Sequence, residues 1–420
     1  MAMSDLPRDL LEGILSRVPV QSTKAVRSTC KNWNTLSYDQ SFTKKLKTLA
    51  IKDNELLVVM MMDYKVYLMS VNLHGIHKDD DNVKSCIIHK AKLVRLNDDA
   101  DHGVDIISSV FHCDGLLLCI THEHDIRFTL VVGNPYCGQF RSIKLRADPK
   151  LFDRYALGYE KNDSFRNYKI LRRYDKRLSI FNEFDIYNFN SGSWKVFHLA
   201  LDWKIPYFQL GVSLKGNTYW FAREMCIAEE GRLRTDLPSF LICFDFTTER
   251  FGQRLRLPFD SYCDQDTVTL SSVREEQLAV LFKGKDTLRM EIRVTNKIDP
   301  GEALWNKLFL AVNLPSLTGP QYLHWARSFL IDEKKNIVVV LGKNASNPTR
   351  NLAYVVGNYG YFKQVYLGVS TQKFCYPLVC SYVPSSVQIK QDVRRSSDIK
   401  ASWLKRFFNF NASLRVIFMF

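Results

Sequence analysis

Hydrophobic and polar positions follow two different periods along this 420-residue chain, and the change falls near residue 50. Near the N-terminus, large apolar side chains recur at helical spacing: Leu6, Leu10, Leu11, Ile14, Leu15 and Val18. From about residue 50, short apolar runs rich in β-branched and aromatic residues alternate with clusters of Gly, Asn, Asp and Pro. The pattern predicts a small helical unit followed by a large all-β region.

The first helix has plausible start and stop signals. Ser4 or Asp5 can cap its N-terminus, Pro7 is tolerated in the first turn, and Pro19 ends the apolar run. We therefore expect a helix of about three turns. Two further short helices are predicted from the segments "STKAVRSTC" and "CKNWNTLSYD", which makes residues 1–47 a three-helix unit.

The apolar stripe of the first helix is wider than two short helices can cover, because it holds two large residues in each turn. A unit of this size has little core of its own. The stripe must therefore pack against a partner protein or against the next domain of the same chain. Periodicity alone does not choose between the two.

The β region contains a repeat. A strand, a polar turn and an aromatic that opens the next strand recur five times, in "GNPYCGQFRSIKL", "YNFNSGSWKVFHL", "FDFTTERFGQRLRLP", "VTNKIDPGEALWNKLFL" and "VVGNYGYFKQVYL". The aromatics lie 54 to 57 residues apart: Phe140, Trp194, Phe251, Trp305 and Phe362. An even period of this length is typical of propeller blades, and we expect these aromatics to lie in blade cores.

A second hairpin precedes each of these units, so each repeat supplies a four-stranded blade. Five blades would run from about Val104 to Leu367. Upstream, "ELLVVMMMDYKVYLMSVN" and "KAKLVRL" offer three more strands, and downstream "FCYPLVCSYVP" offers one. Three strands plus one predict a sixth blade closed by both ends of the domain, which would remove exposed sheet edges.

Composition limits the class of protein. With 46% hydrophobic and 24% charged residues, the chain is globular and long enough for two or three domains. No secretory signal is visible, and no apolar run approaches the roughly 20 residues that span a bilayer. The ten cysteines are scattered among apolar neighbours, which is typical of reduced core thiols. We expect a soluble protein of the cytoplasm, the nucleus or both, without a transmembrane segment.

The net charge of +14 is concentrated at the two ends. Residues 1–47 carry +4 and residues 387–420 carry +5, which leaves +5 for the 339 residues between them. No zinc-finger spacing, helix-turn-helix or aromatic-basic RNA-binding motif stands out. The charge therefore indicates a solvated surface, and nucleic acid is an unlikely partner.

Motifs that carry chemistry are absent from the sequence. His122 and His124, with His112 and Cys113 nearby, lack a second ligand pair at zinc spacing, and the acidic stretches lack the pattern of a calcium loop. No Walker loop, GxSxG, HExxH or GxGxxG occurs. We expect no catalytic residues, no bound metal and no cofactor, and hence a protein that is not an enzyme.

The N-terminal segment "LPRDLLEGILSRVPVQSTKAVRSTCKNWNTL" resembles the F-box, with a Leu-Pro start, an apolar helix, "RVP" and an Arg-x-x-Cys-Lys-x-Trp segment. The matching positions include Arg27 and Lys31. The resemblance implies that the apolar face docks on a Skp-type adaptor of a cullin-RING ubiquitin ligase. The implied adaptor-binding residues are Leu6, Pro7, Leu10, Leu11, Ile14, Leu15, Val18, Pro19, Val26, Cys30 and Trp33.

Two positions depart from the F-box pattern. Gly13 stands where related sequences usually have Glu, and Thr23 stands where they usually have Leu. A glycine inside a helix costs about 1 kcal/mol relative to alanine, and Thr23 has less side chain to bury than leucine. We expect a weaker affinity for the adaptor than is typical.

The segments "LGYEKNDSFRNYKIL", "YNFNSGSWK", "GVSLKGNTYWFA" and "FLICFDFTTERFG" resemble the type 1 F-box-associated interaction domain of plant F-box proteins, which is kelch-like. The expected fold is thus a multidomain α plus all-β protein: a short three-helix F-box at 1–47, a kelch-like β-propeller of six four-stranded blades at 48–386, and a poorly ordered basic and aromatic tail at 387–420. A basic amphipathic helix is the alternative for the tail.

The resemblance implies a substrate-recognition subunit of an SCF-type E3 ubiquitin ligase, in which the propeller binds a client protein that the sequence does not identify. One alternative is a kelch-like interaction scaffold whose degenerate F-box no longer binds the adaptor, and another is an RNA or acidic-ligand binder. The substrate-binding residues are unknown from sequence. Variable loops are the candidates, namely those at 199–206, 224–238, 260–265 and 314–321.

Overall fold

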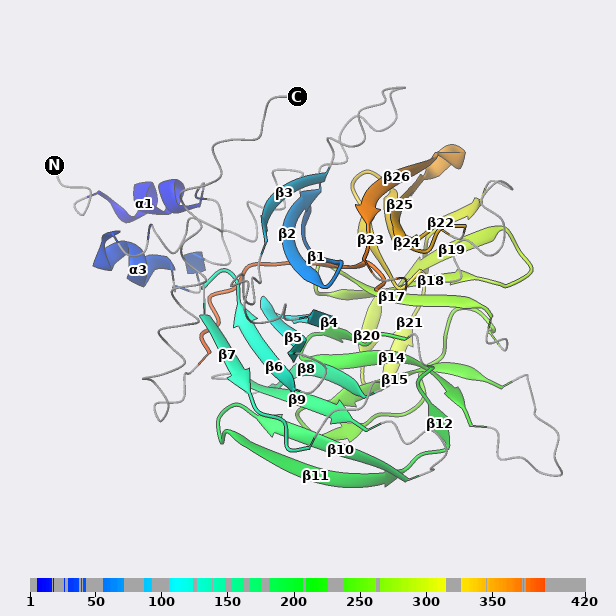
Figure 1. Ribbon diagram of the computed structural model, residues 1–420, viewed down its shortest axis with the longest axis horizontal. Helices are drawn as coiled ribbons and strands as arrows, with labels where there is room; N and C mark the ends of the chain where they lie inside the picture. Colours follow the sequence, from blue (N-terminus) through cyan, green and yellow to red (C-terminus); the bar gives the residue numbers. More distant parts are fainter. Residues whose placement is uncertain are drawn as a thin grey trace.

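The structure is a computed structural model. It describes residues 6–16, 18, 26, 29–37, 39, 41–42, 56–71, 87–92, 106–123, 127–137, 139–147, 153–161, 166–174, 181–206, 209–225, 237–261, 265–314, 326–344, 346–371, 373 and 375–389. A small helical unit lies beside a ring of six β-sheets (Figure 1). The predicted combination of an N-terminal α unit and a six-bladed propeller is confirmed.

The helical unit contains α1 (Arg8–Leu15) and α3 (Lys31–Ser37). The first helix is shorter than the predicted three turns, and its N-cap is Pro7 in an extended conformation, with no side-chain cap. The Pro7 carbonyl accepts the backbone N–H groups of Leu10 and Leu11, both at 3.1 Å, so the proline itself starts the helix. Ser4, Asp5 and most of the predicted second helix lie outside the described residues.

Each of the first five blades is an antiparallel sheet in chain order from the centre outward, except that in blade 3 the first two short strands both pair with the third. Blade 1 contains β4 (Ile106–Cys113), β5 (Leu116–Glu123), β6 (Arg127–Asn134) and β7 (Gln139–Ile143), and blade 2 contains β8 (Arg154–Glu160), β9 (Asn167–Arg173), β10 (Phe181–Asn188) and β11 (Ser193–Ala200). Blade 3 contains β12 (Trp203–Lys204), β13 (Val212–Leu214), β14 (Asn217–Glu224), β15 (Ser239–Asp245) and β16 (Arg250–Phe251).

Blade 4 contains β17 (Thr267–Val273), β18 (Gln277–Lys283), β19 (Arg289–Val294) and β22 (Lys307–Asn313), with a small hairpin of β20 (Lys297–Asp299) and β21 (Glu302–Leu304) between its last two strands. Blade 5 contains β23 (Ser328–Asp332), β24 (Ile337–Lys343), β25 (Arg350–Gly357), the 3-10 turn η4 (Asn358–Gly360) and β26 (Phe362–Val369). Repeated hairpins of similar length thus build five equivalent sheets.

Blade 6 joins the two ends of the propeller, as the strand count predicts. Its order from the centre is β27 (Leu378–Ser381), β1 (Leu56–Met62), β2 (Lys65–Val71) and β3 (Ile87–Lys92). In the register of β1 and β27, Val58 lies opposite Ser381 and Met61 lies opposite Leu378. The C-terminal strand therefore closes the ring and leaves no open edge at this interface.

Six clusters of buried apolar side chains hold the ring together, one at each interface between neighbouring blades. The cluster that contains Met61, Leu68, Leu117 and Val131 joins blade 6 to blade 1 and completes the circle. The repeat aromatics are partly buried against these clusters, as predicted: Phe140, Trp194, Phe251, Trp305 and Phe362. The core of the propeller therefore lies between its blades.

The two repeat tryptophans also bind backbone of the preceding blade. Trp194 Nε1 donates to the carbonyl of Lys144 at 2.9 Å, and Trp305 Nε1 donates to the carbonyl of Arg256 at 2.9 Å. Lys144 and Arg256 each follow the outer strand of the blade before. The indole thus gives the repeat a polar link between neighbouring blades as well as apolar contact.

The chain continues past β27 across the turn of blade 1. Asn134 Nδ2 donates to the carbonyls of Ser385 and Val387 at 2.9 and 2.7 Å. Gly115, at φ +77°, lies directly under this segment, and a Cβ there would come within 2.4 Å of Ser385 Oγ. Ile389 is buried against blade 1, so contacts of the propeller reach three residues beyond 386. Residues 390–420 lie outside the described residues.

Candidate partner-binding sites

The first helix divides its apolar stripe between an internal core and solvent. Leu11 and Leu15 are each 6% exposed and pack against Trp33, Leu36 and Phe42. Leu10 and Ile14, one turn apart and next to that buried face, are 57% and 41% exposed. The propeller leaves both side chains uncovered. The helical unit thus offers a small apolar surface, which we call the α1 face and define as Leu10 and Ile14.

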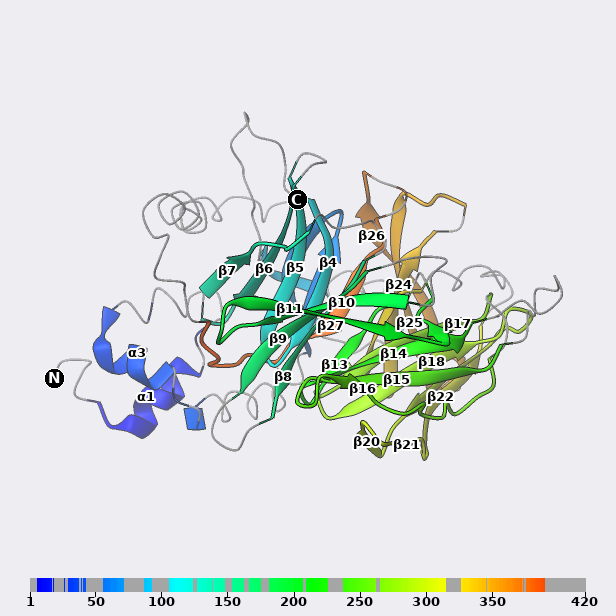
Figure 2. The same ribbon diagram turned by 90° about the horizontal axis from the view of Figure 1, so that it is seen from below.

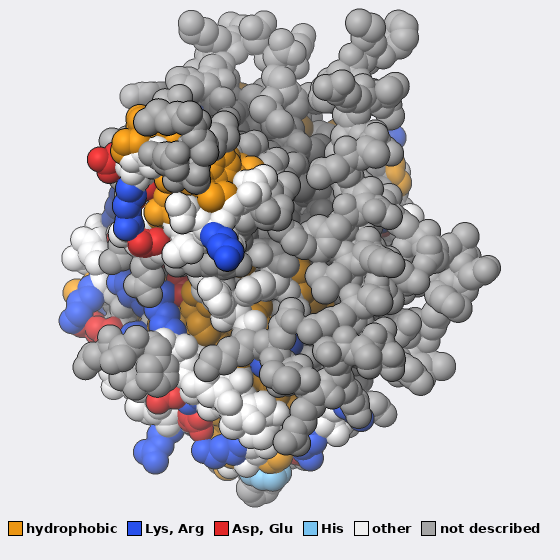
Figure 3. Space-filling model, turned by 90° about the vertical axis from the view of Figure 1, so that its left-hand side faces the viewer, with side chains coloured by type: hydrophobic (Ala, Val, Ile, Leu, Met, Phe, Trp, Pro, Cys, Tyr) orange, Lys and Arg blue, Asp and Glu red, His pale blue; other side chains and the backbone are white. Residues whose placement is uncertain are grey.

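The helical unit lies on the side of the molecule shown in Figure 3, where hydrophobic side chains reach the surface next to acidic and basic ones. Arg8, which starts the helix, is the main polar link of this region. Its Nε is 3.0 Å from Glu12 Oε1, and its Nη2 is 2.6 Å from Asp39 Oδ2. The ion pair between Arg8 and Asp39 therefore links the helix that carries the α1 face to the segment after α3.

Asp39 has its pKa held well below the usual range. It accepts hydrogen bonds from the hydroxyl and the backbone N–H of Ser41, at 2.6 and 2.7 Å, and it accepts another from Arg8. The carboxylate is thus ionised throughout the neutral range, where it can hold Arg8 in place.

The residues predicted to bind an adaptor do not all lie on one surface. Leu11, Leu15 and Trp33 are buried in the core of the helical unit, so their side chains are inaccessible to a partner in this structure. Leu6, Val18, Val26 and Cys30 are partly buried against the same core. Pro7 is exposed at the start of α1. Pro19 and Thr23 lie outside the described residues.

The helical unit meets the propeller at blade 1, where the Tyr136 hydroxyl donates to the carbonyl of Ser37 at 3.4 Å. Tyr136 lies in the turn between the third and fourth strands of that blade. In antiparallel blades this turn lies at the same face as the turns between first and second strands. We call this side the hairpin face. Figure 2 shows the helices and the β20–β21 hairpin on the same side of the ring.

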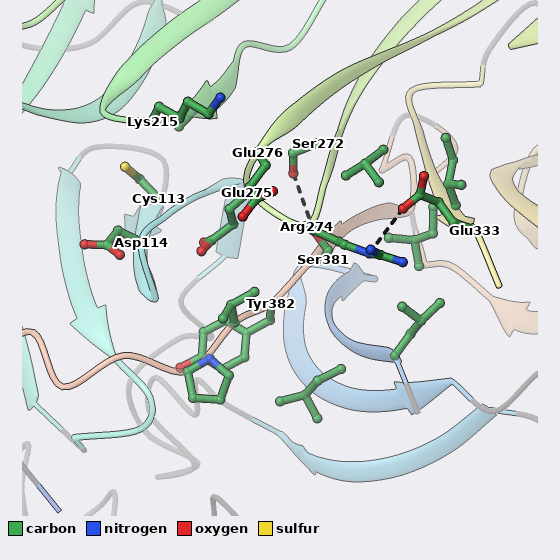
Figure 4. Close-up of a pocket in the computed structure, with 18 of the residues that line it drawn as sticks. Cys113, Asp114, Lys215, Ser272, Arg274, Glu275, Glu276, Glu333, Ser381 and Tyr382 are labelled. Carbon is green, nitrogen blue, oxygen red and sulfur yellow. Dashed lines mark hydrogen bonds and ion pairs between the residues drawn. The ribbon is translucent and has the colours of Figure 1, made fainter. Parts of the chain in front are cut away.

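A cavity of about 560 Å³ opens at the hairpin face, at the centre of the ring. We call it the central pocket. Every blade lines it, through residues that include Asp114 of blade 1, Arg166 of blade 2, Lys215 of blade 3, Glu275 of blade 4, Glu333 of blade 5 and Tyr382 after blade 6. Figure 4 shows these turns around a common space. Since ligand pockets in proteins have volumes of about 300–1,000 Å³, the cavity is large enough for several side chains of a partner.

Two ion pairs between neighbouring blades lie among the lining residues of the central pocket. Asp114 of blade 1 accepts from Arg166 of blade 2, and also from the Tyr168 hydroxyl. Arg274 Nε of blade 4 is 3.1 Å from Glu333 Oε2 of blade 5. These pairs hold the rim in one arrangement, with side chains that also face the cavity (Figure 4).

The residues that could carry chemistry have structural roles here. His112 Nε2 accepts the backbone N–H of Gly115 at 3.1 Å and lies 3.4 Å from Glu275 Oε1. Burial raises the pKa of the Cys113 thiol well above its ordinary value, which disfavours the thiolate that a nucleophile requires. Burial also raises the pKa of Tyr159 to about 12. The pocket therefore presents neutral hydroxyl and thiol groups together with fixed charges, an arrangement suited to binding.

The histidines that lack a second ligand pair at zinc spacing, and for which the sequence predicts no bound metal, are not all described. The side chain of His122 and all of His124 lie outside the described residues, and the part of the chain that is described contains no group of three or more potential metal ligands.

Among the described residues, no helix is long and apolar enough to cross a membrane. The described cysteines are free, and five of them are buried: Cys113, Cys119, Cys137, Cys243 and Cys375.

The loops proposed from their length belong to the face opposite the central pocket, because they join second to third strands or lead from one blade to the next. The prediction of a loop at 199–206 is wrong for part of the segment. Trp203 and Lys204 form β12, which pairs with Arg223 and Glu224 of β14. Trp203 is 5% exposed, so burial of a large aromatic explains the difference. Residues 226–236, 262–264 and 315–325 of the other loops lie outside the described residues.

The sequence prediction missed the central pocket. Its lining residues lie in hairpin turns separated by about 50 residues, and each turn alone resembles an ordinary surface turn. The signal was present in the predicted repeat, since equivalent hairpins of a propeller must end near the same axis. Which side chains face the cavity depends on the closure of the ring.

Comparison with known proteins identifies the two regions. The family model for the F-box domain matches residues 3–45, and the model for the F-box associated beta propeller domain matches residues 57–389. F-box protein At5g36730 of Arabidopsis thaliana is 62% identical over 400 residues, which cover 94% of this chain and 95% of that protein. F-box/kelch-repeat protein At3g16740 of the same plant is 51% identical over 404 residues, which cover 92% and 99%.

Solved structures show a weaker similarity. TolB from Acinetobacter baumannii aligns with a TM-score of 0.40 and 11% identity, over 81% of this chain and 72% of that one. A similarity this low carries no argument about function.

Proposed function

Because the chain belongs to the family of F-box proteins with an F-box associated β-propeller domain, we propose that it is the substrate-recognition subunit of an SCF-type E3 ubiquitin ligase. The α1 face docks on a Skp-type adaptor, and the propeller holds a client protein. Catalysis belongs to the other subunits. The receptor acts by raising the effective concentration of the client near the ubiquitin-conjugating enzyme.

The exposure of Leu10 and Ile14 is the observation that carries the adaptor proposal. Complete burial of a side chain of this size is worth about 1.5–3 kcal/mol. Leu10 and Ile14 gain only part of this free energy while they stay exposed to water. Their neighbours Leu11 and Leu15 are already used in the core of the F-box. A partner that covers the α1 face therefore gains apolar burial without unfolding the unit.

The buried members of the predicted set support the same interface indirectly. Leu11, Leu15 and Trp33 hold α1 against α3 and so fix the position of the α1 face. Pro7 is exposed beside it. We propose that the direct contacts come from Leu10, Ile14 and Pro7, and that the buried residues position them.

A reducing compartment suits this assignment. The cysteines of the described chain are free, as is usual for proteins of the cytoplasm and nucleus. We place the complex in one or both of these compartments, and a fluorescent fusion of the full chain would test the placement.

Co-purification of the full chain with a Skp-type adaptor tests the function. We expect stable capture of the wild type, and loss of capture by the double variant Leu10→Asp, Ile14→Asp, because two buried carboxylates would lack partners. Val369→Asp is the matched control, since Val369 is 63% exposed on β26 of the propeller. Thermal unfolding of the three proteins checks that each is folded.

Failure of the folded wild type to bind any adaptor would overturn the proposal. It would favour the alternative of a kelch-like interaction scaffold with a degenerate F-box. Equal capture of the wild type and the double variant would remove the α1 face from the interface.

A further inference from the structure

We infer that the central pocket is the client-binding site, and that it takes a peptide segment that combines apolar side chains with one acidic and one basic residue. This inference rests on the proposed function, because it names the class of client segment that the receptor would hold. It is argued from the pocket's apolar lining, its unpaired charges and its position.

The apolar part of the lining calls for apolar residues in the segment. Leu56, Leu57 and Val383 are half-buried at the cavity, and Leu330 and Tyr382, which also line it, are buried. Apolar side chains that are only half-buried gain further burial when a ligand covers them. The bound segment therefore carries apolar side chains.

The charged part of the lining calls for charged residues in the segment. Asp114 is paired with Arg166, and Arg274 is paired with Glu333. Lys215 of blade 3 and Glu276 of blade 4 have neither an ion pair nor a side-chain hydrogen bond among the described residues. Both are exposed and both line the pocket (Figure 4). One unpaired cation and one unpaired anion are complementary to a segment that carries one charge of each sign.

The position of the pocket suits a receptor. It opens at the hairpin face, on the side where Tyr136 contacts Ser37 of the F-box. Figure 2 shows the F-box helices on that side of the ring. A client segment held there would lie on the adaptor side of the propeller, where the ligase needs it.

Selection of a displayed library of random peptides on the full chain tests the inference directly. We expect enriched sequences that combine apolar residues with one acidic and one basic residue. Lys215→Glu should then select two basic residues. The double variant Lys215→Glu, Glu276→Lys should exchange the positions of the acid and the base.

A synthetic peptide of the enriched sequence gives the magnitude. Each single reversal should weaken its binding about tenfold, and reversing the matching charge of the peptide should restore it. Lys204→Glu and Asp260→Lys are control reversals at exposed positions of the opposite face, and they should leave binding unchanged. Thermal unfolding confirms that the variants are folded.

Two results would overturn the inference: no enriched sequence, or enriched sequences that stay the same in all charge variants. The selection needs no adaptor, so its failure is separable from failure of the proposed function. If the adaptor is captured through the α1 face while peptides ignore Lys215 and Glu276, the receptor stands and the central pocket is not its client site.

Discussion

The F-box and the propeller bury their apolar residues in opposite ways. In the propeller, six clusters lie between blades, and each blade covers the faces of its two neighbours. In the F-box, one small cluster of Leu11, Leu15, Trp33, Leu36 and Phe42 is all the described core, and the adjacent Leu10 and Ile14 stay exposed. Closure of the ring buries the apolar faces of the blades against one another, whereas the F-box leaves the α1 face exposed.

The difference teaches where each region can tolerate change. A closed ring has no end at which apolar surface is left over, so its stability depends on packing at every interface. A unit of about 40 residues cannot enclose a comparable core. We therefore expect propeller substitutions to act mainly on stability and F-box substitutions to act mainly on adaptor binding.

The largest expected effect comes from removing an aromatic side chain from the cluster between blades 2 and 3. Phe244 is fully buried, with its ring 5.0 Å from those of Phe246 and Phe251. Phe244→Ala should lower the free energy of unfolding by about 3–5 kcal/mol, because it leaves a cavity. Denaturant unfolding measures the effect, with the exposed Val369→Ala as control. A loss below about 1 kcal/mol would contradict the closed-ring account.

A buried ion pair gives the next effect within the propeller. Arg172 Nη2 is 2.7 Å from Asp153 Oδ2, and both side chains are almost fully buried. Arg172→Met should cost about 3 kcal/mol in unfolding free energy, because the buried Asp153 carboxylate loses its guanidinium partner. Adding Asp153→Leu should recover most of the loss. If the double variant is as unstable as the single one, the cost comes from packing and not from charge.

Gly13 offers a smaller effect that should improve the F-box. A Cβ at this exposed position in α1 would meet nothing within 4 Å. Gly13→Ala should stabilise the helix by about 1 kcal/mol, and adaptor binding should tighten severalfold if docking orders α1. Titration calorimetry on the full chain measures it, with Gly301→Ala in the propeller as control. Unchanged affinity would show that α1 is already fully formed without the adaptor.

The smallest expected effect is a pH dependence of the link between α1 and Asp39. Since the pKa of Asp39 is lowered in the folded protein, its contribution is complete above the unfolded value of about 3.9 and disappears as the pH falls through the folded value. The difference in thermal stability between the wild type and Asp39→Asn should therefore be constant near neutral pH and shrink in acid. A difference that grows on acidification would contradict the assignment.

Repetition explains how much of the fold could be predicted. The hairpins at Asp114–Gly115 and Lys215–Gly216 have glycine at a position of positive φ, which is a local signal for a tight turn. The aromatics Trp194 and Trp305 mark equivalent positions in two blades. Both signals need only neighbouring residues, so the six blades and their closure followed from the sequence.

One error came from a contact between separate segments. The pairing of Trp203 with Glu224 turned a predicted loop into β12, and this partner had no mark in the local pattern. The other error came from a choice between local signals, since Pro7 started α1 in place of the predicted cap and the helix ended at Leu15.

The sequence by itself determined the family of the chain, the helical unit, the six blades and their closure by both ends, because these depend on periodicity and on short motifs. Only the tertiary structure decided which half of the α1 stripe stays exposed, since the packing of α3 covers Leu11 and Leu15 and leaves Leu10 and Ile14. It also decided that Lys215 and Glu276 share one cavity. Residues 61 positions apart meet there because ring closure brings every first hairpin to one axis.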